Sequence, residues 1–296
     1  MARKNIFQKL SNNVNYYDEI NRIEQLLKNK SGIRIEVAPK NWGLEPDFHS
    51  LSIESFVDTF VFKSWKQRGT CISCEDMRES LGFDFIFDAK ESELELNEIL
   101  NYFEYASNIL NLVTYVKLKS NACYSETDIY KAAEKNIRSC LNWLNHEIKT
   151  FDKQQKVLVV EKNPSATAVA EIVEEDIAYK IMKYNHYILK GDIEAKKEIL
   201  LTLGNELEPR RKELNFINKQ LTDDVFFLLN NLNIRHNNRS KKDKNYKEYV
   251  AKMKKDKLES WYDELYQMIL LCFLLLDNRN RTTEIKELKE KIIGVI

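Results

Sequence analysis

The segment NNLNIRHNNRSKK, residues 230–242, places Arg235 directly before His236, after an apolar stretch and ahead of several lysines. Histidine can accept and return a proton near neutral pH, and arginine offers a planar fork of donors to phosphate oxygens. Together they suit RNA cleavage without a metal, in which a base removes the proton of a ribose 2′-hydroxyl and arginine stabilises the charge that develops on the phosphate. A surface histidine or a helix C-terminal cap is the alternative.

The residues that follow are strongly basic, although the chain as a whole has no net charge. Residues 235–257, here called the basic segment, contain ten Lys or Arg and three acids, an excess of seven positive charges. Such a concentration attracts phosphate backbones by releasing counterions, and Tyr246 and Tyr249 could stack on unpaired bases. The residues from which we expect RNA contacts are Asn237, Asn238, Arg239, Lys241, Lys242, Lys244 and Tyr246. A solvated loop between helices is the alternative.

The order of these features resembles a known family. An apolar helix, the motif NLNIRHN at residues 231–237, a polar loop and a long apolar helix follow one another in FLLNNLNIRHNNRSKK and WYDELYQMILLCFLLLD. This order resembles the C-terminal half of HEPN (higher eukaryote and prokaryote nucleotide-binding) domains, which are helical bundles of many bacterial abortive-infection and toxin proteins. The resemblance covers at most residues 166–278, and its distinctive part is Arg235 with its neighbours.

The resemblance implies a metal-independent endoribonuclease of an abortive-infection, antiphage system. It further implies a homodimer that places two arginine–histidine sets around one cleft, with Arg235 on the scissile phosphate and His236 as acid or base. In the family the histidine follows the arginine after four to six intervening residues. Ser240, Lys241 and Lys242 occupy those positions here, so only the adjacent His236 is available.

Two other functions are compatible with the same residues. The first is a non-catalytic helical module that uses the basic segment to bind RNA or an acidic protein. The second treats the last helix as an oligomer interface, with Trp261, Tyr262 and Tyr266 exposed on one side.

Composition favours helices joined by short polar loops, because the chain is 43% hydrophobic and 31% charged with seven Gly and four Pro. The longest apolar run, at residues 268–276, has nine residues, about half of a bilayer span. The first residues lack the apolar core of a secretory signal. We therefore expect a cytoplasmic protein that does not enter the membrane.

The cysteines and the catalytic motifs give little sign of a metal or cofactor. Five cysteines argue against a disulfide framework, and Cys71 with Cys74 has the spacing of half a zinc site. The nearby candidates for further ligands are Cys123, Cys140 and His146, but free thiols are the favoured interpretation. No Gly-rich phosphate loop, His-Glu-x-x-His or nucleophile elbow occurs, so we expect no cofactor and no metal.

We expect two parts: residues 1–160, mostly helical with a minor β element, and residues 161–296, a HEPN-like helical bundle. In the first part the apolar spacing predicts helices over 12–30, 92–119 and 125–151, with Ser125 in a capping box, and short strands at 33–37, 83–88 and 156–161. In the second part it predicts helices over 166–191, 192–218, 222–236 and 257–278, with Gly191, Asp192 and Thr222 as caps.

Overall fold

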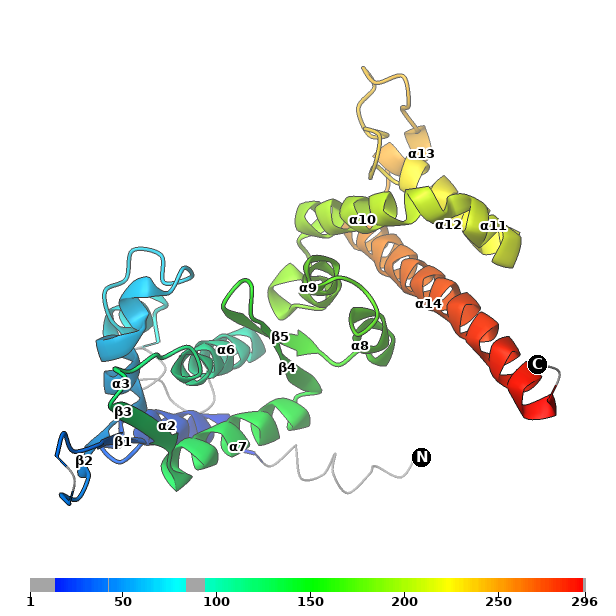
Figure 1. Ribbon diagram of the computed structural model, residues 1–296. Coiled ribbons are helices and arrows are strands. Elements are labelled where there is room, and N and C mark those ends of the chain that lie inside the picture. Colours follow the sequence, from blue (N-terminus) through cyan, green and yellow to red (C-terminus); the bar gives the residue numbers. More distant parts are fainter. Residues whose placement is uncertain (1–13, 42, 84–93, 295–296) are drawn as a thin grey trace, which may run out of the picture. The chain divides into compact units, whose positions relative to one another are not determined.

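The computed structural model describes residues 14–41, 43–83 and 94–294 (Figure 1). Of these described residues, 61% are helical and 10% are in strands, which confirms the mostly helical fold that the composition predicts. The chain divides into two compact units, Met1–Lys162 and Asn163–Ile296. This boundary lies two residues beyond the division that we expected after residue 160.

The N-terminal unit is built around one buried helix, α6. Burial extends to most positions of α6, which contacts α2, α3, α7 and β5. The elements of this unit are α2 (Tyr16–Lys28), β1 (Ile33–Val37), β2 (Asp47–Leu51), α3 (Ile53–Phe60), η1 (Phe62–Ser64), α4 (Cys74–Ser80), α6 (Leu96–Val113), β3 (Ala122–Glu126), α7 (Asp128–Trp143), β4 (His146–Phe151) and β5 (Lys156–Glu161).

Three of the strands form an antiparallel sheet in the order β2-β1-β3. In this sheet Ile33 lies opposite Leu51 on one side and Glu126 on the other. The strand predicted at residues 33–37 is confirmed as β1. The predicted strand at 83–88 lies outside the described residues, apart from its first residue. Ser125 belongs to β3 rather than to a capping box.

The β4–β5 hairpin replaces the end of a predicted helix. We expected a helix to residue 151, but α7 ends at Trp143 and Asn145 adopts a left-handed backbone with a φ of 60°. β4 then pairs with β5, with His146 opposite Glu161. The strand predicted at 156–161 is confirmed, and it pairs with residues 146–151, which therefore form a strand instead of the end of a helix.

A buried ionic cluster joins α2, α3, α4 and α6. The guanidinium of Arg78 pairs with Glu54 and lies 3.2 Å from Glu24, and all three side chains are buried. The Tyr102 hydroxyl donates to the second oxygen of Glu24 at 2.8 Å. Burial raises the pKa of Glu54, against the opposing effect of its bond with Arg78. Because the charges compensate one another inside the unit, the cluster is a structural joint.

The C-terminal unit is helical throughout its described residues. Its long last helix, α14, contacts α8, α10, α11 and α12 (Figure 1). The elements are α8 (Pro164–Ala170), α9 (Glu175–Tyr184), η3 (Tyr187–Leu189), α10 (Ile193–Leu207), η4 (Glu208–Arg210), α11 (Arg211–Ile217), α12 (Lys219–Asn231), α13 (Glu248–Ala251) and α14 (Lys255–Ile293).

The predicted helices of this unit are largely present but differently divided. The helix expected over 166–191 is two helices, α8 and α9, and the helix expected over 192–218 is interrupted at η4. The Asp192 side chain accepts from the Ala195 N–H, so this predicted cap is confirmed. Gly191 has a φ of 81°, but it does not cap the predicted helix, because α9 ends at Tyr184 with Asn185 as its cap. Thr222 was predicted as a cap, but Asn218 caps α12.

The third functional interpretation, an interface made by the aromatic residues of the last helix, is corrected in part. Tyr262 is 0% exposed and Tyr266 1% exposed, and both belong to the core, while Trp261 is half-buried. The Tyr266 hydroxyl donates to the Ile181 carbonyl at 2.8 Å. Over the residues that the structure describes, no helix is both long and apolar enough to cross a lipid bilayer.

Helices α10 and α12 approach closely at Gly204, and this contact supports the segment that follows α12. A Cβ atom on Gly204 would lie 2.8 Å from both terminal methyl carbons of Leu229, which is fully buried. The hydrogen atom of glycine is therefore required for the present helix spacing.

We predict that Gly204→Val lowers the free energy of unfolding by about 1–3 kcal/mol, because added methyl groups would overfill a closely packed contact. Urea unfolding followed by circular dichroism measures the change. Asn205→Val is the matched control, since Asn205 is exposed on the same helix. Equal effects of the two substitutions would contradict the proposed packing.

Candidate nucleic-acid interface

The basic segment begins at a sharp turn that follows α12. Asn233 has a φ of 61°, in the left-handed region that asparagine enters more readily than most residues. The Arg235 N–H donates to the Leu229 carbonyl at 3.0 Å, and the buried Tyr262 hydroxyl of α14 donates to the Leu232 carbonyl at 3.0 Å. These bonds fix the start of the segment to both α12 and α14.

Asn238 holds the two ends of the loop together. Its side-chain oxygen accepts from the Asn233 N–H at 2.7 Å, and its amide nitrogen donates to the Asn245 carbonyl at 2.8 Å. Its backbone carbonyl accepts from the Lys247 N–H at 2.8 Å. The residue is 0% exposed. We expected Asn238 to position RNA, but its side chain is occupied inside the protein and stabilises the loop.

Arg235 is directed into the helical unit. Its guanidinium lies 2.6 Å from the Glu208 carboxylate, donates to the Gly204 carbonyl at 3.1 Å and lies 5.3 Å from the centre of the Phe226 ring. The side chain is 16% exposed. The positive charge of Arg235 is therefore already compensated by a carboxylate.

His236 and Asn237 are exposed, unlike the residues on either side. The His236 carbonyl accepts from the Asn238 N–H at 3.0 Å, and the Asn237 side chain accepts from the Ser240 N–H at 3.1 Å. Among the described residues no contact joins the side chains of Arg235 and His236. The structure thus places the two predicted catalytic groups in different surroundings, one half-buried and one in solvent.

Most of the charge of the basic segment is displayed to solvent. Tyr249 is 76% exposed, Tyr246 is half-buried, and Glu248 forms an ion pair with Lys252. The exposed basic residues are Arg239, Lys241, Lys242, Lys244, Lys247, Lys252, Lys254, Lys255 and Lys257. This arrangement, with cations around an exposed aromatic ring, can bind a phosphate backbone and stack on a base.

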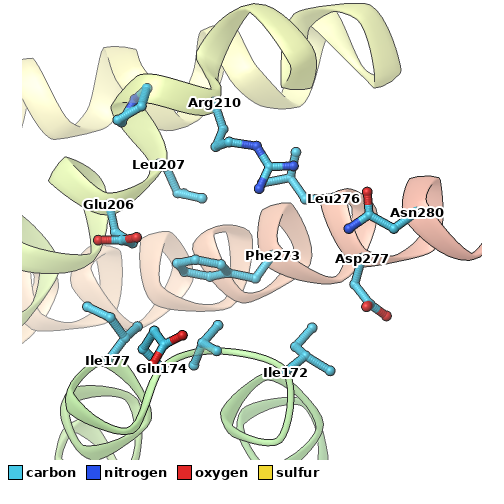
Figure 2. A pocket seen from close by; sticks show the side chains of 12 residues that line it. Ile172, Glu174, Ile177, Glu206, Leu207, Arg210, Phe273, Leu276, Asp277 and Asn280 are labelled. Atoms are coloured by element: carbon cyan, nitrogen blue, oxygen red, sulfur yellow. The ribbon is translucent and has the colours of Figure 1, made fainter.

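A separate pocket of about 320 Å³ is lined by α9 and the residues just before it, α10, η4 and α14 (Figure 2). Leu207, Phe273 and Leu276 give it an apolar floor. Its polar residues are Glu174, Glu206, Arg210, Asp277 and Asn280. Arg210 is bonded to Glu213 at 2.6 Å and Asp277 to Arg281 at 2.6 Å, so the guanidinium of Arg210 is already paired and Glu174 and Glu206 add negative charge to the lining. The pocket is therefore unsuited to phosphate, and none of its lining residues belongs to the basic segment.

In a second charged cluster of this unit, the charged groups compensate one another. The buried Lys196 ammonium lies 2.8 Å from both Glu259 and Asp263, and the Tyr184 hydroxyl donates to Asp263 at 2.9 Å. Burial raises the pKa of Glu259, but its bonds with Lys196 and the Gly191 N–H bring the pKa below its ordinary value. The cluster joins α9, α10 and α14.

The cysteines and two further histidines have structural surroundings. Cys71 and Cys74 are buried free thiols, and burial raises the pKa of Cys74. In the described parts of the chain no group of three or more His, Cys, Asp or Glu could hold a metal. His146 and His186 are each 8% exposed and lie within the fold.

Sequence reasoning missed Glu208 and Gly204, which hold Arg235. Glu208 and Gly204 lie 27 and 31 residues before Arg235 in the chain. The charged sequence around them gives no sign of a partner so far along the chain. The missed signal was Pro209, which lies in η4, where the helix expected over 192–218 is interrupted.

No family model, curated protein or solved structure matches the chain. The function is therefore inferred from the geometry of the basic segment.

We predict that Asn238→Ala releases the loop, because it leaves the Asn233 N–H and the Asn245 carbonyl without their partner, at a cost of about 1–3 kcal/mol. Hydrogen exchange followed by mass spectrometry should show faster exchange of residues 233–247, while α10 and α14 keep their protection. Lys242→Ala, at an exposed side chain of the same loop, should change nothing. Unchanged exchange in Asn238→Ala would contradict this role.

Proposed function

We propose that the C-terminal unit binds single-stranded RNA through the basic segment. The observation that carries the proposal is the display of nine exposed cations along the basic segment, five of which lie on the loop at residues 233–247 that Asn238 closes from within. A loop fixed in this way presents its charges at set positions, so binding costs less ordering of the chain than a free tail would require. A purely solvated loop would not need a fully buried asparagine at its base.

Phosphate contacts supply the affinity in this proposal. Each phosphate that a lysine or arginine neutralises releases counterions, so binding weakens as salt rises, with a slope of about −0.7 per contact on single strands. The chain has equal numbers of acids and bases. Electrostatic attraction of RNA therefore acts near the basic segment rather than over the whole molecule.

Tyr249 favours single strands over duplexes. A tyrosine that is 76% exposed among lysines can stack on an unpaired base, which contributes about 1–3 kcal/mol per base in proteins of this kind. Paired bases are already stacked within a duplex and do not offer that face. The choice of RNA over DNA, and a cytoplasmic setting in antiphage defence, rest on the resemblance to HEPN domains.

RNA cleavage by Arg235 and His236 is the second candidate function, which the exposure of His236 beside the basic segment favours. The pairing of Arg235 with Glu208 at 2.6 Å counts against it. To stabilise a phosphate, the guanidinium would have to exchange the carboxylate for the substrate. We therefore rank binding before cleavage.

We predict that replacing Lys241, Lys242 and Lys244 together by Gln weakens the binding of a short unstructured RNA. If all three contact phosphate, the slope of log affinity against log salt becomes shallower by about 2. Fluorescence anisotropy over a series of potassium chloride concentrations measures both quantities. The matched control replaces Lys190, Lys212 and Lys219, exposed lysines of the same unit outside the basic segment, by Gln.

An equal loss of RNA affinity in the two triple variants would contradict the proposed site. Equal affinity of the wild type for single-stranded and duplex RNA would contradict it as well. The same mixtures, kept in EDTA and separated on a denaturing gel, test cleavage. Intact RNA is expected. Cleavage would instead yield fragments that end in 2′,3′-cyclic phosphate and that are absent with His236→Ala. Such fragments would show that the protein is a metal-independent endoribonuclease and not only a binding module.

A further inference from the structure

The end of α14 extends beyond the other helices of its unit, as its red portion shows in Figure 1. Up to Leu276 the helix contributes buried residues to the core. From residue 281 to residue 293, no residue whose side chain is described is buried. At a rise of about 1.5 Å per residue this part is about 20 Å long.

This exposed part carries apolar residues at coiled-coil spacing. Ile285, Leu288 and Ile292 are 50%, 55% and 75% exposed and are separated by three and four residues. In a heptad, Ile285 and Ile292 take position a and Leu288 takes position d. Isoleucine at position a with leucine at position d favours a coiled coil of two parallel helices. The preceding a position is Asn278, the residue type that fixes the register of two-stranded coiled coils.

Charges beside the apolar stripe are complementary to a second copy of the same stripe. Glu284 takes position g and Lys289 takes position e of the following heptad. In a parallel pair these two positions face each other across the interface, so Glu284 of each chain meets the partner's Lys289. The outward positions of the same turns carry Lys286, Glu287 and Glu290. The segment is therefore complementary in charge to a second copy of itself.

We propose that residues 278–293 of α14 form a parallel two-stranded coiled coil with a second copy of this chain. Two heptads alone would be too short to form stable helices in water. Here the helix is already formed, because α14 is continuous with its buried N-terminal half. Pairing therefore does not have to nucleate the helix, which lowers the free-energy cost of association. Dimers would also carry two basic segments, which raises their apparent affinity for long RNA.

Sedimentation equilibrium of the full chain over a range of concentrations tests the proposal. The expected mass rises from 35.0 kDa towards twice that value. Ile285→Lys with Leu288→Lys should remain monomeric at every concentration, with an unchanged circular dichroism spectrum because both side chains are exposed. A monomeric wild type, or a double variant that dimerises as the wild type does, would overturn the proposal.

Charge exchange tests the parallel register. Glu284→Lys alone and Lys289→Glu alone each place like charges opposite one another twice, and each should weaken self-association about tenfold. A mixture of the two single variants should restore a dimer that contains one of each. Lys286→Glu, on the outward face, is the control and should associate as the wild type does. Unchanged association of the single variants would refute the register and with it the proposal.

Discussion

The loop at residues 233–247 carries five exposed cations and one acid, and the repulsion among these cations must be offset by contacts that carry no charge. Asn238 provides them, because an amide side chain can accept and donate at once. It does both from a fully buried position, between the turn at Asn233 and the backbone of Asn245. Lysine has no acceptor and an ionised carboxylate has no donor, so neither could close the loop in the same way. The display of cations to solvent depends on this neutral joint.

Arg235 and His236 illustrate how neighbours in sequence take different roles. The guanidinium compensates Glu208 and covers the Phe226 ring, so it ties η4 to the end of α12. The imidazole lies in solvent beside the exposed cations. An arginine whose charge is already paired contributes less to the local field than the free lysines do. This division of roles is why binding, rather than catalysis, is the function that we place first.

Local sequence patterns predicted those elements that depend on neighbouring residues in the chain. Apolar periodicity, the Asp192 cap and the alternation at residues 156–161 each correspond to an observed element. Residues 146–151 were assigned to a helix because their β partner follows later in the chain. Asn237 and Asn238 are identical in type and adjacent, yet one is exposed and one fully buried. The backbone groups that Asn238 bonds, at Asn233, Asn245 and Lys247, distinguish the two residues, and the residue types alone do not reveal these bonds.

The central claim is that RNA lies on the basic segment. Photocrosslinking with RNA that contains 4-thiouridine, followed by peptide mass spectrometry, tests it most directly, because the reaction marks residues that touch a base. The account predicts crosslinks within residues 235–257, with Tyr249 foremost and the buried Asn238 unmarked. Crosslinks confined to Met1–Lys162, or an RNA that crosslinks nowhere on the chain, would contradict it.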